Sequence, residues 1–165
     1  MNAIDDDLVG MDRLRAALIV LKLDARIVSP GTPMPTVPLA AAAVGCADDQ
    51  IIKTVVFATP DGQAVIAIAN GTRRIDRRQL ASAAQVASLK LAQPDFVLDR
   101  TGYPAGGVSP IGIRDVDAPV IVDSAVLGQR IVFGGAGTEN DLLEIETSQL
   151  LVLTGACVCP IVRED

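Results

Sequence analysis

The sequence has no histidine. A serine nucleophile activated by a histidine base is therefore excluded, and any hydrolytic chemistry has to use other groups. Tryptophan is also absent and aromatic residues make up only 2% of the chain, so the core has to be built from Val, Ile, Leu and Ala. Because half of the residues are apolar, the composition is typical of a β-rich or mixed α and β domain, not of a disordered chain.

Cysteine is scarce as well. The three cysteines are Cys46, Cys157 and Cys159, an odd number. A C-x-C pair in a chain without histidine matches no usual zinc spacing. We therefore expect free thiols, no metal ion and no cofactor.

Long hydrophobic runs are missing too. No apolar run reaches the roughly 20 residues that a membrane span requires. Asp5-Asp6-Asp7 gives the N-terminus the wrong charge for a signal or transit peptide, so we expect a cytoplasmic protein without membrane contact. The formal net charge of −6 disfavours nucleic-acid binding through overall charge, although a local basic patch can still engage a few phosphates.

The length of 165 residues suits one domain over residues 1–165. Asp61-Gly62 between two apolar runs predicts a β-hairpin, and Asp76 followed by Gln79 resembles a capping box that opens a helix. Helices are predicted over residues 9–23, 39–44, 76–84, 94–101 and 148–154, and strands over 25–28, 51–58, 63–69, 120–122, 130–133, 142–146 and 157–162. This mixture predicts an α+β fold.

The run Gly106-Gly107-Val108-Ser109-Pro110-Ile111-Gly112, called the glycine loop below, is the most informative stretch. Three glycines and a proline allow backbone shapes that few other residues permit, and can bring bare N–H groups against a small ligand. A tight connection that only turns the chain is the alternative interpretation. Ser109 can donate or accept a hydrogen bond within the loop.

Lys53 is the only charge in the apolar run from Ile51 to Phe57. Whichever face of this strand is buried, the lysine has apolar neighbours, and a buried ammonium requires compensation. One interpretation is a strand-edge lysine whose head group reaches water. The other is a cation presented to an anionic substrate group, such as a phosphate.

Four arginines fall within six positions: Arg73, Arg74, Arg77 and Arg78. At helical spacing the first and third, and the second and fourth, lie on the same face, although the first two precede the predicted helix. They form either a solvated helix face or a patch that contacts nucleic-acid phosphates.

The C-terminal third holds two further patterns. Glu144 and Glu146 alternate with apolar residues, which points both carboxylates to one side of a strand, either for acid–base work or as its solvated face. We favour the solvated face. Gly134-Gly135-Ala136-Gly137 follows a predicted strand but lacks the G-x-G-x-x-G spacing, so a dinucleotide site is not expected.

The segment Ile52-Lys53-Thr54-Val55-Val56-Phe57, followed by Thr101-Gly102-Tyr103-Pro104-Ala105 and the glycine loop, resembles the YbaK/prolyl-tRNA-synthetase-associated editing domain family. The resemblance implies a single domain with a mixed, curved sheet packed by helices. It also implies hydrolysis of amino acids wrongly attached to tRNA, with cysteine or alanine on the proline tRNA as candidates. No protein nucleophile is needed, because a hydroxyl of the terminal ribose or a water attacks the ester.

The same resemblance implies roles for individual residues. It assigns Lys53, Gly106 and Ser109 to catalysis, with the lysine near the terminal phosphate or ribose and the loop around the carbonyl. Substrate binding is assigned to Gly107, Val108, Pro110, Thr36 and Glu146. The arginines at 73, 74, 77 and 78 would touch the acceptor stem, and an aminoacyl-tRNA synthetase would be a transient partner.

Two segments depart from the family pattern. Relatives carry a Gly-Gly-Lys-Arg-Gly-like segment where this chain has Gly134 to Asp141 without basic residues, and the Pro30–Pro38 loop is also unlike the usual segment. A tRNA- or nucleotide-binding module without turnover is therefore the second hypothesis. A protein-interaction domain that uses the Pro30–Pro38 loop is the third.

Overall fold

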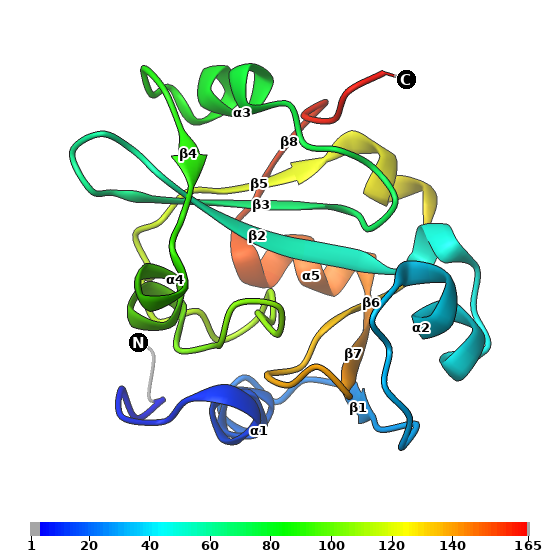
Figure 1. Ribbon diagram of the computed structural model, residues 1–165. Helices are drawn as coiled ribbons and strands as arrows, with labels where there is room; N and C mark the ends of the chain where they lie inside the picture. The colour runs from blue at the N-terminus through cyan, green and yellow to red at the C-terminus, as the bar shows by residue number, and fades with distance from the viewer. Residues whose placement is uncertain (1–3, 165) are drawn as a thin grey trace.

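Two β-sheets form the centre of the structure (Figure 1). The computed structural model describes residues 4–164. One sheet is mixed, in the order β4 (Lys90–Leu91), β2 (Ile52–Ala58), β3 (Ala64–Asn70), β5 (Val120–Asp123) and β8 (Cys157–Cys159). The other is antiparallel, in the order β1 (Arg26–Val28), β7 (Leu142–Glu146) and β6 (Ile131–Gly135). A parallel bridge between Ile51 and Phe133 joins them, so strands expected in one mixed sheet divide between two.

Five α-helices surround the sheets in the described part of the chain. They are α1 (Gly10–Val20), α2 (Val37–Val44), α3 (Arg77–Ala84), α4 (Pro94–Thr101) and α5 (Thr147–Thr154). Short 3-10 helices at Asp48–Gln50 (η1) and Ser124–Gly128 (η2), and the two-residue strand β4, were not predicted. The α+β class is confirmed. Within residues 4–164, no helix has the length and apolarity to cross a membrane.

The predicted helix boundaries have local causes that the structure confirms. Gly45 and Gly102 end α2 and α4 in the left-handed region, with φ of 74° and 80°. The Asp76 side chain accepts hydrogen bonds from the N–H groups of Arg78 and Gln79 and so caps α3. The reciprocal half of the capping box is not formed, because the Asp76 N–H donates to the Ile161 carbonyl instead.

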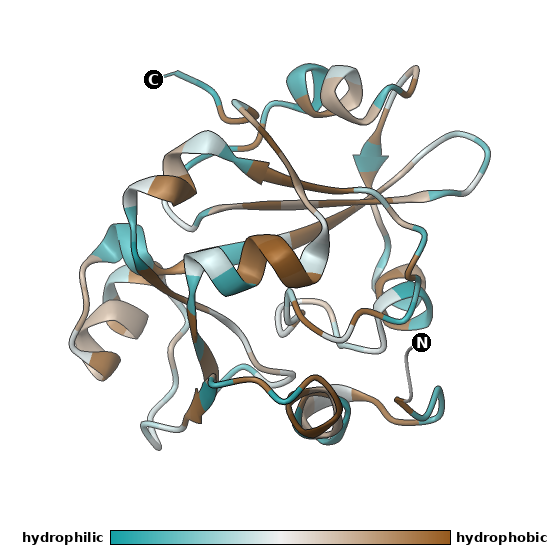
Figure 2. Cartoon of the chain, turned by 180° about the vertical axis from the view of Figure 1, so that it is seen from behind, coloured by the Kyte–Doolittle hydropathy of each residue, from teal (hydrophilic) through white to brown (hydrophobic). Residues whose placement is uncertain are grey.

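The central hairpin of β2 and β3 contributes to the hydrophobic cores on both faces of its sheet. β2 and β3 pair over their whole length from Ile52–Asn70 to Ala58–Ala64, and all seven residues of β3 are buried. On one side, Phe57, Val65 and Ile121 pack under Leu80 of α3. On the other side, a larger core joins the strands to α1, α4 and α5. Figure 2 shows apolar residues along these strands and on α5 beneath them.

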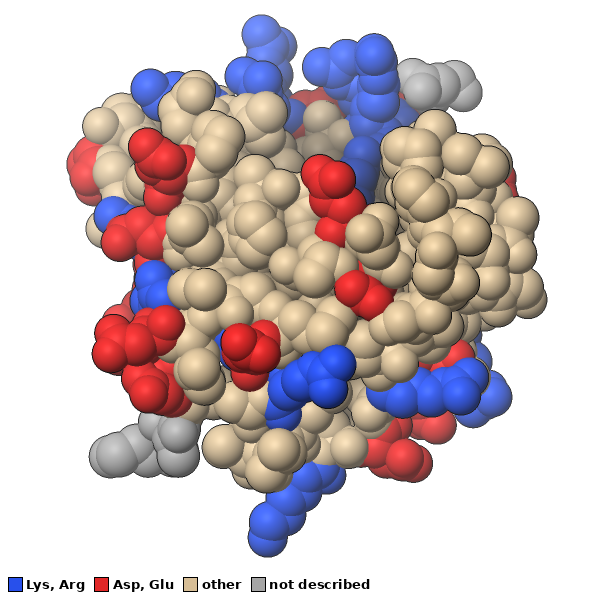
Figure 3. Space-filling model, turned by 60° about the horizontal axis from the view of Figure 1, so that its bottom comes forward, with Lys and Arg blue, Asp and Glu red and all other residues tan. Residues whose placement is uncertain are grey.

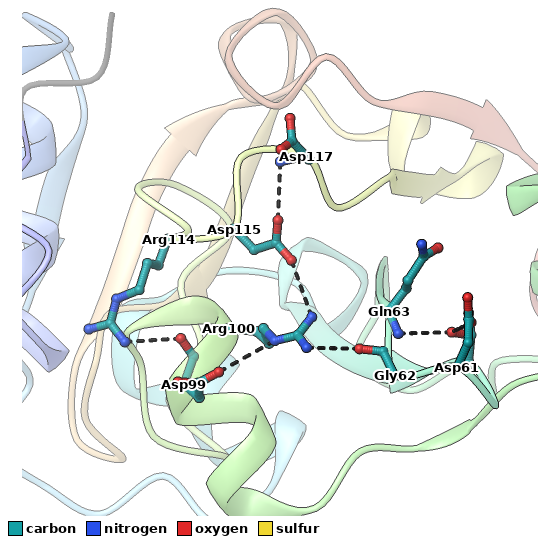
Figure 4. Close-up of polar contacts among 9 residues, drawn as sticks. Asp61, Gly62, Gln63, Asp99, Arg100, Arg114, Asp115 and Asp117 are labelled. Atoms are coloured by element: carbon teal, nitrogen blue, oxygen red, sulfur yellow. Dashed lines mark hydrogen bonds and ion pairs between the residues drawn. The ribbon is translucent and has the colours of Figure 1, made fainter.

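Arg100 fastens α4 to the tip of the hairpin (Figure 4). Its guanidinium donates to the Gly62 carbonyl at 2.8 Å and lies 3.6 Å from a carboxylate oxygen of Asp115. The Asp115 N–H in turn donates to the Arg100 carbonyl at 2.8 Å. The helix, the hairpin turn and the end of the segment after the glycine loop are thereby held together.

Candidate functional site

A cavity of about 570 Å³ lies beside β2, and we call it the β2 cavity. Its walls come from β2, the start of α4, the glycine loop and the ends of β6 and β7. Among the lining residues are Ile52, Lys53, Thr54, Val56, Ala92, Pro94, Val97, Gly106, Val108 and Leu142. None of the described lining residues is acidic, so the cavity is an apolar chamber with Lys53 as its charge.

The strand edge that faces this cavity is uncovered around Thr54. β4 pairs with β2 only at Phe57 and Ala58, and the Ala92 N–H donates to the Val56 carbonyl at 3.1 Å. Main-chain groups in an antiparallel pair alternate in direction, so those of Thr54, like those of Val56, point away from β3. The Thr54 hydroxyl is also buried without a hydrogen-bond partner among the described residues. Thr54 therefore has main-chain groups on the cavity side of the strand that β4 does not pair.

The glycine loop is fixed from behind by buried side chains. The Tyr103 hydroxyl donates to the Ile111 carbonyl and the Arg13 Nε donates to the Gly112 carbonyl, both at 2.6 Å. Both side chains are fully buried, and burial lowers the pKa of Arg13 and raises that of Tyr103. A buried cation that binds main-chain carbonyls gives the loop a rigid base.

At the front of the loop, Gly106 has a φ of +87°, where an L-residue is strained. Nothing within residues 4–164 accepts a hydrogen bond from its N–H. This glycine lines the β2 cavity, so the loop presents a free N–H donor beside the apolar walls, as the sequence suggested.

The run from Gly134 to Gly137 is the platform on which the glycine loop rests. A Cβ on Gly135 would lie 2.2 Å from the Val108 carbonyl oxygen, and one on Gly137 would lie 2.4 Å from the Met11 nitrogen. The Gly137 N–H donates to the Gly107 carbonyl at 2.8 Å. These glycines are required by close backbone packing.

Lys53 is half-buried at the boundary between two hollows. Its ammonium donates to the Arg73 carbonyl at 2.5 Å. Burial lowers the pKa of Lys53, and the positive charge of Arg74 lowers it further. Because both causes disfavour the charged form, an anion at this position would stabilise the lysine.

The second hollow, of about 320 Å³, is the basic cleft. It is lined by the cations Lys53, Arg74, Arg77 and Arg163 and by the apolar residues Val55, Phe57, Ile75 and Leu91. Lys53, Val55 and Leu91 line both hollows, so the cleft and the β2 cavity adjoin. Figure 3 shows Lys and Arg side chains gathered at the top edge of the molecule.

The remaining residues assigned from the resemblance lie away from the β2 cavity lining. Ser109 is fully buried, and its hydroxyl accepts a hydrogen bond from the Ile111 N–H at 3.2 Å. Gly107 and Pro110 are buried on the side of the loop that packs against the run from Gly134 to Gly137. Thr36 is exposed and caps α2 through the Leu39 N–H.

The two glutamates occupy one solvated face of β7, which is the interpretation favoured from the sequence. Glu146 is exposed and lies 3.6 Å from Arg130, while Glu144 forms a two-pronged contact with Arg26 at 3.0 and 3.1 Å. Both carboxylates line a hollow outside the β2 cavity. The structure therefore does not bring Glu146 to Lys53 and Gly106.

Of the four clustered arginines, Arg74 and Arg77 line the basic cleft, and Arg73 supplies the carbonyl that holds Lys53. Arg78 is exposed in the first turn of α3. Sequence reasoning missed Thr54 and Arg163. The position of Thr54 next to Lys53 on a partly uncovered strand was a usable signal, whereas the meeting of Arg163 with the cleft depends on tertiary contacts.

Comparison with known proteins identifies the family. The model of the aminoacyl-tRNA editing domain matches residues 32–153. The chain belongs to the aminoacyl-tRNA editing domain family. A solved structure proposed to be a trans-editing enzyme for prolyl-tRNA synthetase is 30% identical to this editing domain, with a TM-score of 0.86, over 93% of this chain and 97% of that one.

Curated relatives of the editing domain fall into two kinds. The uncharacterized protein YwhH of Bacillus subtilis is 29% identical over 121 residues, which is 72% of this chain and 74% of YwhH. A proline–tRNA ligase of Nitratidesulfovibrio vulgaris is 27% identical over 146 residues, which is 82% of this chain. The matched region makes up 25% of that ligase.

Proposed function

We propose that this editing domain hydrolyses the ester bond of mischarged aminoacyl-tRNA. The observation that carries the proposal is the β2 cavity, which is lined by apolar residues, by Gly106 with its free N–H and by Lys53. The editing-domain family and the resemblance to a structure proposed to be a trans-editing enzyme support the same reaction. Cysteine or alanine on the proline tRNA are the first substrates to test.

In this proposal the amino-acid side chain enters the apolar part of the cavity, near Val97 and Val108. The ester carbonyl lies against the Gly106 N–H, which stabilises the negative charge that develops on the oxygen. Lys53 holds the phosphate or ribose of the terminal nucleotide. Water attacks the carbonyl while a hydroxyl of the terminal ribose positions it, the ester C–O bond breaks, the amino acid leaves with the oxygen of the water in its carboxyl group, and a proton of the water ends on the ribose oxygen. If the ribose hydroxyl attacks first, it forms a new ester that water then hydrolyses in the same way.

This assignment requires no side chain that acts as a general base. Positioning a reactive group and stabilising the oxyanion can each contribute several orders of magnitude to the rate. The absence of acidic residues from the described cavity lining therefore fits a substrate-supplied or water nucleophile. Thr54 gives a second polar contact on the opposite wall.

The experiment is a deacylation assay with a panel of mischarged tRNAs. We expect hydrolysis of at least one, and a loss of roughly 100-fold or more in kcat/KM for Lys53→Ala. Lys90→Ala is the matched control, because Lys90 is an exposed lysine outside the β2 cavity lining. Binding of tRNA without turnover of any ester would contradict the proposal and favour the non-catalytic module.

The relatives that are proline–tRNA ligases contain the matching region within a longer chain. We propose that this editing domain acts beside such a ligase as a transient partner. Sedimentation of the editing domain with a proline–tRNA ligase, with and without tRNA, tests this association. Independent sedimentation in both conditions would contradict it.

A further inference from the structure

The basic cleft combines two kinds of surface. Four cations and four apolar residues line it together. No Asp or Glu is among its described lining residues, in a chain with 20 acidic and 14 basic residues. The cations suit an anionic group of a ligand, and the apolar residues suit a flat, apolar group of the same ligand.

The C-terminal segment builds one side of this cleft. Val162 forms an antiparallel bridge with Ile75, and the Arg163 N–H donates to the Arg74 carbonyl at 2.7 Å. The main chain therefore holds Arg163 close to Arg74. Like charges opposed across paired strands are destabilising, so this arrangement calls for a compensating anion.

No acidic side chain of residues 4–164 supplies this compensation. Within the described residues, the guanidinium groups of Arg74, Arg77 and Arg163 form no ion pair with an acidic side chain. One oxygen of the nearby Asp76 carboxylate, Oδ1, accepts from the N–H groups of Arg78 and Gln79 at the start of α3, and this carboxylate forms no ion pair with the cleft arginines. The cations of the cleft are thus available to an external anion.

We propose that the basic cleft is a nucleotide subsite that binds the residue preceding the terminal nucleotide of the tRNA acceptor strand, with Arg163 and Arg74 on its phosphate. The proposal rests on the proposed function, because the terminal aminoacyl nucleotide has to occupy the adjoining β2 cavity. Lys53 lies between the two hollows, at the position of the phosphate that links two successive nucleotides. The preceding base then packs on the accessible apolar residues of the cleft, Leu91 and Ile75.

The test uses two hydrolysis-resistant probes. One is 3′-alanylamino-3′-deoxyadenosine, and the other is the same compound extended at its 5′ end by two cytidylates. We expect the wild-type chain to bind the long probe more tightly than the short one. Arg163→Gln should weaken binding of the long probe by roughly tenfold and leave binding of the short probe unchanged. The slope of log K against log salt for the long probe should fall by about 0.7, the value for one phosphate contact on a single strand.

Arg15→Gln is the matched control, because Arg15 is an exposed arginine on α1 and the substitution changes net charge equally. Arg163→Lys should restore part of the affinity. Equal effects of Arg163→Gln and Arg15→Gln on the long probe would overturn the subsite while leaving the deacylase intact. Failure of the wild-type chain to bind either probe or to hydrolyse any ester would overturn both proposals.

Discussion

Replacing Gly135 by alanine places a methyl group in space that the glycine loop already occupies. An ideal Cβ at this position lies 2.2 Å from the Val108 carbonyl oxygen and 2.8 Å from its carbonyl carbon. Since ordinary van der Waals contact begins near 3.4 Å, the loop has to retreat by about 1 Å. Both contacts are with main-chain atoms, so no side-chain rotation can relieve them.

Two effects of different size are expected from this displacement. Overpacking of a filled interior lowers the free energy of unfolding by about 1–3 kcal/mol, which a folded domain can tolerate. A shift of about 1 Å in the group that positions a reacting carbonyl can lower the rate by about 100-fold. Gly135→Ala should therefore lose far more activity than stability.

The assay pairs single-turnover deacylation with urea unfolding of the same variants. Gly134→Ala is the matched control, because the three atoms nearest to a Cβ there are side-chain atoms of Pro110 and Ile52, at 3.3 and 3.4 Å. We expect the control to keep its rate within about threefold of the wild type. Equal deacylation rates for the two variants would refute the assignment of the glycine loop to carbonyl positioning.

Further predictions concern three buried or half-buried side chains. Because burial and Arg74 lower the pKa of Lys53, KM for tRNA should rise with pH in a range below the ordinary lysine value of 10.5, and Lys53→Arg should abolish the rise in steady-state assays. Burial raises the pKa of Tyr103, so the stability due to its neutral phenol is present below about pH 10 and lost above it. Ultraviolet titration of this single tyrosine should show ionisation together with unfolding, and Tyr103→Phe, which orphans the Ile111 carbonyl, should cost about 1–2 kcal/mol in urea unfolding. Arg100→Met should lower the free energy of unfolding by about 1 kcal/mol, a small value because the side chain is 33% exposed, and an unchanged urea midpoint would contradict this.

Much of the fold follows from local chemistry in the sequence. Asp61-Gly62 predicted the hairpin, Asp76 the start of α3, and Gly45 and Gly102 the ends of two helices, because turns and caps depend on neighbours in sequence. The division of the strands between two sheets could not be predicted, because it depends on which strand edges meet in space. The strand β4 was missed for the same reason, since it has only two residues and is defined by their pairing with β2.

The candidate site was predicted in part. Lys53 and the glycine loop stand out in the sequence, and the structure places Lys53, Gly106 and Val108 around one cavity. The burial of Ser109 was not predictable, because a serine in a glycine-rich loop can face either a ligand or the protein. Arg163 lies 89 positions from Arg74, and only the long-range bridge at Ile75 brings it to the basic cleft.

The uncovered edge of β2 has a consequence for the behaviour of the chain at high concentration. Unpaired main-chain groups on a strand edge are a template onto which a strand from another molecule can add, which leads to aggregation. A cavity that needs Thr54 uncovered therefore carries this hazard permanently. A charged side chain on an edge strand, lysine above all, opposes strand addition, and this chain has Lys53 on β2 beside the uncovered stretch. Lys53, which we assign to substrate binding, therefore also disfavours the addition of a strand from a second molecule to β2.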